Sequence, residues 1–189
     1  ARFASKFPDV AQPHTWDDLL NPAFKGEIVM TDPVASSTAY LFLQDQLQRL
    51  GYFSLAFHNG SYTFYHRDRT HENLGYDAYF ASGHHLDAFT GHSYPTDTEM
   101  FEGTLPAYIG HPPFSVYYMT VSGHAPYEKS SSLVRKYYDR VNEIVGDEYY
   151  EKTKYYICYQ MELEKAMTIL VSKLEAAGIA YTLYSNIKP

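Results

Sequence analysis

Residues 50–77 read LGYFSLAFHNGSYTFYHRDRTHENLGYD, and the prediction of the fold starts from the pattern of this stretch. Residues 52–57 are apolar and aromatic and lead directly into an Asn-Gly pair, which predicts a buried strand followed by a loop. The loop, residues 57–77, holds three His, two Arg and two Asp among aromatic residues. Such a mixture suits a ligand site, although a well-packed surface loop remains an alternative.

Helix and strand signals alternate on both sides of this stretch. The patterns predict strands at 27–30, 52–57 and 114–121, and helices at 16–20, 39–50, 97–109, 132–145 and 147–177. On the last helix, 3- and 4-residue steps predict an inner face made of Tyr156, Leu163, Met167, Leu170, Leu174 and Ala177. The alternation predicts an α/β fold with a mostly parallel central sheet flanked by helices. In such sheets, ligands bind beyond the carboxyl ends of the strands.

Composition narrows the possible partners. The chain has 189 residues and a formal net charge of -7, which argues against a nucleic-acid partner. It has 20 Tyr and 9 His, and these residues suit wet clefts for polar or sugar-like ligands, unless the excess is a compositional bias. Cys158 is the single cysteine, so no intrachain disulfide forms. No run of about 18 apolar residues occurs, so we expect no transmembrane segment.

Four residues are candidates for a site at the sheet edge. His58 and His124 each follow a predicted strand, and an imidazole can exchange protons or bind phosphate oxygens near neutral pH. Arg67 lies among aromatic residues and precedes Asp68, an arrangement that suits a phosphate clamp. Tyr65 offers a flat face and a hydroxyl to a glycerol or sugar group. The alternatives are packed histidines and a surface Arg–Asp pair of little energetic weight.

Other motifs are weaker. Ser36, Ser37 and Thr38 precede a helix, where hydroxyls and free N–H groups can bind an anion; the alternative is that Ser37 or Thr38 simply caps the helix. The Gly-His-His triplet at 83–85 lacks metal-ligand spacing, so we expect no metal site from it. Glu162 and Glu164, two residues apart on the last predicted helix, are interpreted as solvated surface.

Three segments carry a family resemblance: the stretch at 50–77, PFSVYYMTVSGHAPY at 113–127 and YYICYQMELEKAMTILVSKLEAAGI at 155–179. Together they resemble the lipoteichoic acid synthase-like sulfatases, which are phosphoglycerol transferases of the alkaline phosphatase superfamily. The resemblance implies a sulfatase-like fold over residues 41–180 and a phosphoglycerol-type substrate, either a small molecule or a lipid headgroup. It also implies that His58, Tyr65, Arg67 and His124 contact this substrate, with His124 the catalytic candidate. Tyr65 stands where the family usually has Trp.

Part of the catalytic machinery that this resemblance implies is not found in the sequence. Family members use a nucleophilic Thr and a Mn²⁺ ion whose ligands include an Asp-His pair, and no Asp-His dipeptide occurs in this sequence. We therefore expect an incomplete sulfatase-like domain that binds a phosphoester headgroup without full catalytic competence, because metal and nucleophile make phosphoryl transfer accessible.

Residues 12–40, which include HTWDDLLNPAFKGEIVMTDPVASSTAY at 14–40, resemble a different family, the iron-type periplasmic substrate-binding proteins of ABC transporters. This resemblance implies an anion or iron site at Ser36, Ser37 and Thr38. The predicted division is a substrate-binding-protein-like segment at 1–40, the sulfatase-like domain at 41–180 and a tail at 181–189. Two alternatives to the transferase fragment stay open: a solute-binding module and an inactive chimeric scaffold. Both resemblances imply a location outside the cytoplasmic membrane.

Overall fold

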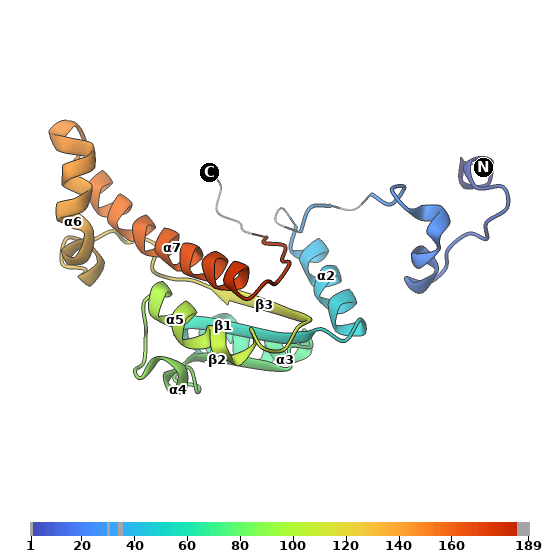
Figure 1. Ribbon diagram of the computed structural model, residues 1–189, viewed down its shortest axis with the longest axis horizontal. Coiled ribbons are helices and arrows are strands. Elements are labelled where there is room, and N and C mark those ends of the chain that lie inside the picture. Colours follow the sequence, from blue (N-terminus) through green and yellow to red (C-terminus); the bar gives the residue numbers. More distant parts are fainter. Residues whose placement is uncertain (1, 30, 34–35, 185–189) are drawn as a thin grey trace. The chain divides into compact units, whose positions relative to one another are not determined.

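Figure 1 shows the computed structural model, which describes residues 2–29, 31–33 and 36–184. The chain divides into two compact units, one reaching to Tyr40 and the other comprising Leu41–Tyr184. Among the described residues, no helix has the length and apolar character needed to cross a membrane.

The first unit contains α1 (Arg2–Lys6) and two short 3-10 helices, η1 (Asp17–Leu20) and η2 (Pro22–Phe24). Phe3, Phe7 and Phe24 pack their rings together, with centroids 5.2–5.9 Å apart. The predicted strand at 27–30 is wrong over residues 27–29, which have no strand structure, and residue 30 lies outside the described residues. The helix α2 (Ser37–Arg49) begins in this unit and continues into the second.

The second unit holds the sheet and most helices. In chain order it contains β1 (Phe53–Ser61), η3 (Phe64–His66), α3 (Arg67–Asn73), β2 (Ala78–Ser82), α4 (Asp87–Thr90), α5 (Asp97–Thr104), η4 (Leu105–Ala107), β3 (Phe114–Met119), α6 (Ser132–Val145), η5 (Gly146–Glu148) and α7 (Glu151–Ala176). The strands form a three-stranded sheet in the order β2-β1-β3, and both pairings are parallel. The predicted α/β class with a parallel sheet flanked by helices is confirmed.

Both faces of the sheet are covered. Successive strand residues point to opposite faces, so alternate residues of β1 enter different clusters. Leu55 and Phe57 pack with residues of α5 and α7, whereas Ala56 packs with Tyr76 and Tyr79 next to α3. Figure 1 shows α5 and α7 along one side of the strands and α3 behind them. This two-sided burial explains why β1 reads as a continuous apolar run.

The central aromatic residue of the sheet is Phe57. In register it pairs with Phe80 of β2 and Tyr118 of β3, and the rings stack at centroid distances of 5.5 Å and 5.3 Å. Phe57 is fully buried. Complete burial of such a side chain contributes about 2–3 kcal/mol of hydrophobic stabilisation. The apolar residues 53–57 therefore form the centre of the sheet, and the polar residues from His58 onward follow directly from this buried strand.

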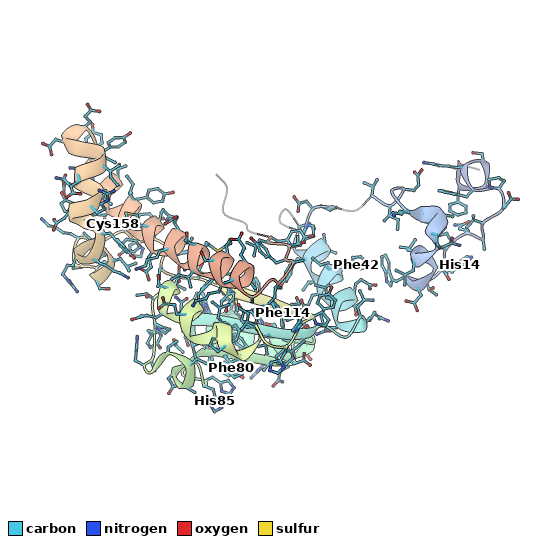
Figure 2. All side chains as sticks on the ribbon, viewed as in Figure 1. His14, Phe42, Phe80, His85, Phe114 and Cys158 are labelled. Atoms are coloured by element: carbon cyan, nitrogen blue, oxygen red, sulfur yellow. The ribbon has the colours of Figure 1, made fainter. Side chains whose placement is uncertain are left out.

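The helices α6 and α7 pack against each other through a second cluster that contains Cys158 (Figure 2). Cys158 is fully buried and unpaired, and its burial raises the pKa of the thiol. The predicted inner face of α7 is correct at Leu163, Leu170 and Leu174. It is wrong at Tyr156, which is exposed because Tyr155, Cys158 and Tyr159 make the α6 contact instead, and at Ala177, which is exposed and lies just beyond the end of α7.

The segment at 57–77 is not the open loop that the sequence predicts. Its first residues extend β1 to Ser61, and α3 occupies Arg67–Asn73. The strand β2, which follows at Ala78, was missed because its five residues carry no alternating pattern. Residues 62–66, which include the short η3, and residues 74–77 are the parts of this segment that lie outside β1 and α3.

Candidate functional site

His58 lies near the carboxyl end of β1 and is 3% exposed. Its Nδ1 donates to the carbonyl oxygen of Met119 on β3, at 3.0 Å. Because a carbonyl oxygen only accepts, Nδ1 carries the proton of the neutral ring, and Nε2 keeps a free lone pair. Burial lowers the pKa of His58, the bond to Met119 opposes this effect, and the charge of Arg67 adds to it. The ring is therefore a fixed, neutral acceptor.

A strained turn places Tyr65 and Arg67 next to this strand end. Tyr65 and His66 have φ values of 54° and 56°, in the left-handed region that costs energy for residues other than glycine. The turn makes Arg67 the first residue of α3. The guanidinium carbon lies 5.4 Å from the ring centroid of Tyr65 and 5.6 Å from that of Phe64. Two aromatic faces thus hold the cation by cation–π attraction.

The proposed clamp between Arg67 and Asp68 is wrong. Oδ2 of Asp68 lies 3.9 Å from Nε of Arg69, and Arg67 is oriented by the aromatic rings instead. Adjacent residues at a helix start point in different directions, which separates the two side chains. Nη1 of Arg67 is buried and has no hydrogen-bond partner among the described residues. Arg67 therefore has a donor that the described protein atoms leave unpaired.

His71 lies one helical turn after Arg67 and was not singled out from the sequence. It is 5% exposed, packs between Tyr76 and Tyr79, and has an Nε2 atom with no hydrogen-bond partner among the described residues. Burial, together with the charges of Arg67 and His58, lowers the pKa of His71 to about 4. His71 is therefore held as a neutral ring in the folded chain.

His124 lies on a separate loop beyond β3. The loop turns through a bond from His124 N to Val121 O, the ring is exposed, and its Nδ1 lies 2.6 Å from the carbonyl oxygen of Ala125. Since β1 and β3 are parallel neighbours, His58 in the last part of β1 and His124 beyond β3 both lie toward the carboxyl edge of the sheet. Within the described part of the chain, no hydrogen bond or ring contact joins the two histidines directly.

A buried polar network links the two histidine segments, and sequence reasoning missed it. Asn59 Nδ2 donates to Asp97 Oδ1 at 2.6 Å, and Ser122 N donates to the same oxygen at 3.2 Å. Asn59 Oδ1 accepts from Val121 N at 3.1 Å. One sequence feature points to this network, the Asn directly after His58. No local pattern around residue 97 indicates which residues its side chain bonds.

Ser36 acts as a helix cap. Its Oγ accepts from Ala39 N at 3.4 Å, at the start of α2. The cap found among the described residues is thus Ser36, whereas the sequence predicts Ser37 or Thr38, of which Thr38 is exposed. The side chain of Ser37 lies outside the described residues, so the anion site predicted there stays a prediction.

The described residues do not form the metal site that the family implies. Over residues 2–29, 31–33 and 36–184, no three His, Cys, Asp or Glu side chains converge closely enough to hold a metal ion. The ring of His84 stacks on Tyr62 at 3.9 Å, and the rings of His84 and His85 lie 4.5 Å apart at 58°. We therefore derive no catalytic step that passes through Mn²⁺.

Glu162 is not the solvated residue that the sequence predicts, although Glu164 is exposed. Its fully buried carboxylate accepts from Lys136 Nζ at 2.8 Å, Tyr137 OH at 2.6 Å and Thr98 N at 3.2 Å. Burial alone would raise the pKa of Glu162, but these bonds together lower it to about 2. Glu162 therefore ties α7 to α6 and to the start of α5.

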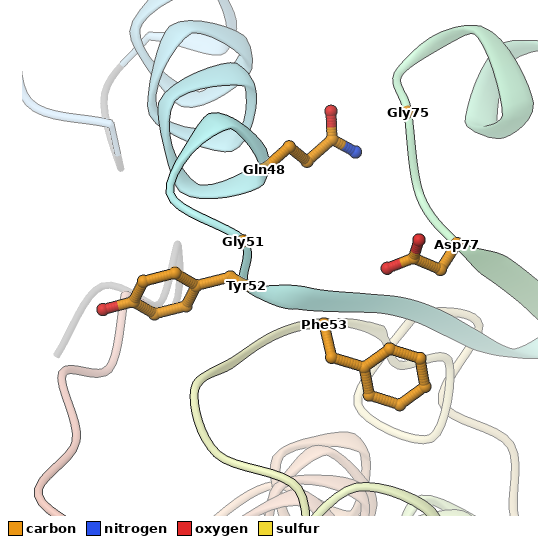
Figure 3. A pocket seen from close by; sticks show the side chains of 6 residues that line it. All are labelled: Gln48, Gly51, Tyr52, Phe53, Gly75 and Asp77. Carbon is orange, nitrogen blue, oxygen red and sulfur yellow. The ribbon is translucent and has the colours of Figure 1, made fainter.

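Two cavities flank the sheet. One, of about 370 Å³, lies at the amino end of β1, far along the strand from His58, and its lining includes Gln48, Tyr52 and Asp77 (Figure 3). The other, of about 200 Å³, lies next to α3, and its lining includes Tyr62, Asp68 and Glu72. Neither of these two cavities is lined by His58, Tyr65, Arg67 or His124.

Comparisons with known proteins agree with this fold. The sulfatase family model matches residues 20–177 of the chain. Among solved structures, the crystal structure of the lipoteichoic acid synthase LtaP from Listeria monocytogenes is similar, with a TM-score of 0.54 and 20% sequence identity. This match covers 70% of the present chain and 32% of the LtaP chain. A comparison with curated protein sequences finds no match. The resemblance of residues 12–40 to substrate-binding proteins stays a prediction.

Proposed function

This chain belongs to the sulfatase family, and from that premise we propose that it is a phosphoglycerol-transferase-type fragment that binds a glycerol-phosphate or related phosphoester headgroup. Its similarity to LtaP concerns the fold, and it spans 32% of that chain. The binding role rests on residues of this chain itself, above all on Arg67.

The unpaired guanidinium nitrogen of Arg67 carries the proposal. Buried polar atoms in proteins are ordinarily hydrogen-bonded, and a buried cationic donor without a partner is costly. Nη1 of Arg67 has no partner among the described residues, while the neighbouring rings hold the guanidinium in place. A phosphate oxygen is the acceptor that a preoriented guanidinium binds best. The phosphoester would thus supply the missing partner.

His58 and Tyr65 complement the guanidinium. The free Nε2 of His58 can accept a hydrogen bond from a glycerol hydroxyl or a protonated phosphate oxygen. Tyr65 is 76% exposed, so its ring and hydroxyl are open to the glycerol portion. His124 would approach from the loop beyond β3, where its exposed ring can serve as a second polar contact. Positive charge and hydroxyl-bonding groups together favour a phosphoester over a neutral sugar.

We further propose that the chain does not complete the transfer reaction by itself and that it acts outside the cytoplasmic membrane. The absence of an Asp-His dipeptide from the sequence supports the first point. The family resemblance supports the second, and on that ground the headgroup would belong to a lipid or to a polymer made from one.

A thermal-shift titration tests the binding role. Glycerol phosphate should raise the melting temperature of the full chain in a concentration-dependent way, because a ligand that binds only the folded state stabilises it. Arg67→Ala should abolish the shift. Arg69→Ala, which removes the same charge from a side chain that is 80% exposed two residues away, should retain it. Equal losses in both variants would mean nonspecific charge attraction and would contradict the proposal.

Two further ligands separate the parts of the headgroup. Inorganic phosphate should bind more weakly than glycerol phosphate, and glycerol alone should leave the melting temperature unchanged. Equal shifts with phosphate and glycerol phosphate would remove the proposed role of Tyr65 with glycerol.

A further inference from the structure

We propose that Asp97 is a positioning residue that holds the end of β1, which bears His58, in register with the loop that bears His124. The inference rests on the proposed phosphoester site, because it concerns how the two histidines of that site are held. Asp97 touches neither histidine and would act through Asn59 and Ser122.

The geometry of the carboxylate gives the first argument. Asp97 is fully buried at the start of α5, and its Oδ1 accepts both from Asn59 Nδ2 and from Ser122 N. Asn59 is 1% exposed and Ser122 is 8% exposed. One oxygen atom therefore joins the residue directly after His58 to the residue two positions before His124.

The direction of the β1 side chains gives the second argument. His58 and Asn59 are consecutive in a strand, so their side chains leave opposite faces. Asn59 makes three bonds on its own face, to Asp97, to Pro95 O at 3.1 Å and from Val121 N at 3.1 Å. A strand residue held this firmly cannot rotate about the strand axis, and His58 on the other face is held with it.

Capping of α5 does not need the carboxylate of Asp97. The N–H groups of Asp97, Thr98 and Glu99 donate to Ser122 Oγ, Glu162 Oε1 and Thr96 Oγ1, respectively. The start of α5 is therefore satisfied without the side chain of Asp97. Burying a carboxylate is costly, and burial raises the pKa of Asp97 while Oδ2 lacks a partner among the described residues. The cost is offset by the contacts to the two histidine segments.

The test compares Asp97→Ala, Asp97→Asn and a control in the full chain. Asn keeps an acceptor at the position of Oδ1, whereas Ala removes it. The control is Thr104→Val, which deletes another fully buried polar group of α5, bonded to Met100 O and Tyr118 OH; among the described residues, Thr104 has no hydrogen bond to residues 58–59 or 121–124.

Two readouts separate positioning from plain stability. The first is amide hydrogen exchange of Val121 and Ser122, whose N–H groups enter the network. The second is the affinity for glycerol phosphate. Asp97→Ala should lose protection at both amides and bind at least about tenfold more weakly. Asp97→Asn should restore both properties, and Thr104→Val should lower stability while leaving both unchanged.

Wild-type affinity in Asp97→Ala would overturn the inference, as would equal weakening in Thr104→Val. If the wild-type chain does not bind glycerol phosphate, the proposed function fails. Amide exchange at Val121 and Ser122 then tests the positioning role by itself. Unchanged protection of these amides in Asp97→Ala would overturn that role. If Asp97→Ala does not fold, Asn59→Ala removes the same link from the other side, and a folded Asn59→Ala variant with wild-type exchange and affinity would also overturn it.

Discussion

Nε2 of His58 lies over Gly60, so closely that a Cβ atom built on Gly60 would stand 2.6 Å from it. Real Cβ atoms do not approach a ring nitrogen this closely, so residue 60 has to be glycine for the ring to keep its position. The free nitrogen of the site and the bond from Nδ1 to Met119 O therefore depend on a missing side chain two residues away.

Gly60→Ala should displace the His58 ring and break its bond to Met119. The expected cost in stability is about 1 kcal/mol, the usual worth of one hydrogen bond. The expected loss in glycerol phosphate affinity is about tenfold, because Nε2 is moved. Gly110→Ala is the matched control, since nothing lies within 4 Å of a Cβ there. Urea unfolding and calorimetric titration check the two effects, and full affinity in Gly60→Ala would contradict the assigned role of Nε2.

His71 predicts a dependence of stability on acid. The pKa of His71 is about 4 in the folded chain and about 6.5 in the unfolded chain, so only the unfolded state takes up this proton between those values. Stability is therefore lost as the pH falls from 6.5 toward 4. His71→Phe keeps an aromatic ring next to Tyr76 and Tyr79, and its stability should lie within about 1 kcal/mol of wild type at pH 7.5.

Between pH 7.5 and pH 5, the stability of His71→Phe should rise relative to wild type by about 2 kcal/mol, because wild type alone loses stability through His71. Urea midpoints at the two pH values measure this change. A difference between the two proteins that stays constant with pH would show that His71 titrates normally and is not held neutral.

Glu162 predicts a second, more acidic transition. Its folded pKa of about 2 lies below the ordinary value of 4.5, so its contribution is fully present above pH 4.5 and is lost as the pH falls toward 2. At pH 7, Glu162→Gln should destabilise the chain by about 1–3 kcal/mol, because Lys136, Tyr137 and Thr98 lose a charged acceptor. The deficit should shrink at pH 3. Glu164→Gln, at an exposed position, is the control, and equal effects of the two changes would contradict the burial of Glu162.

Tyr65 predicts a separation of stability from binding. Glycine adopts the left-handed backbone of Tyr65 and His66 without strain, so either residue can change to Gly with a stability change below about 1 kcal/mol. Only Tyr65→Gly removes a ring that contacts the guanidinium of Arg67. Tyr65→Gly should therefore weaken glycerol phosphate binding while His66→Gly leaves it unchanged. Equal binding by both variants would show that the ring of Tyr65 does not orient Arg67.

Elements with signals in their own sequence were predicted closely. The helix α5 begins at Asp97 as predicted, where Thr96 and Glu99 form a capping box, but it ends at Thr104 and is followed by η4, short of the predicted end at 109. The helix α6 runs from Ser132 to Val145 and ends at Gly146. Capping residues act on the turn in which they lie, so the nearby residues suffice. The prediction that His124 lies beyond the end of a strand is confirmed, whereas His58 lies inside β1, because the strand continues through the Asn-Gly pair to Ser61.

Local sequence signals suffice for the α/β class, the mostly parallel sheet, the start of α5, both ends of α6 and the family resemblance, since these follow from apolar periodicity and from end signals within a few residues. Which side chains share a buried environment depends on the tertiary structure. Asn59, Asp97 and Ser122 meet across separations of 25 to 38 residues, and Glu162 meets Thr98 across 64. Periodicity tells which residues lie on one face of a helix or strand. It does not tell what packs against that face, and the free energy of a buried charge or an unpaired guanidinium depends on those packing partners.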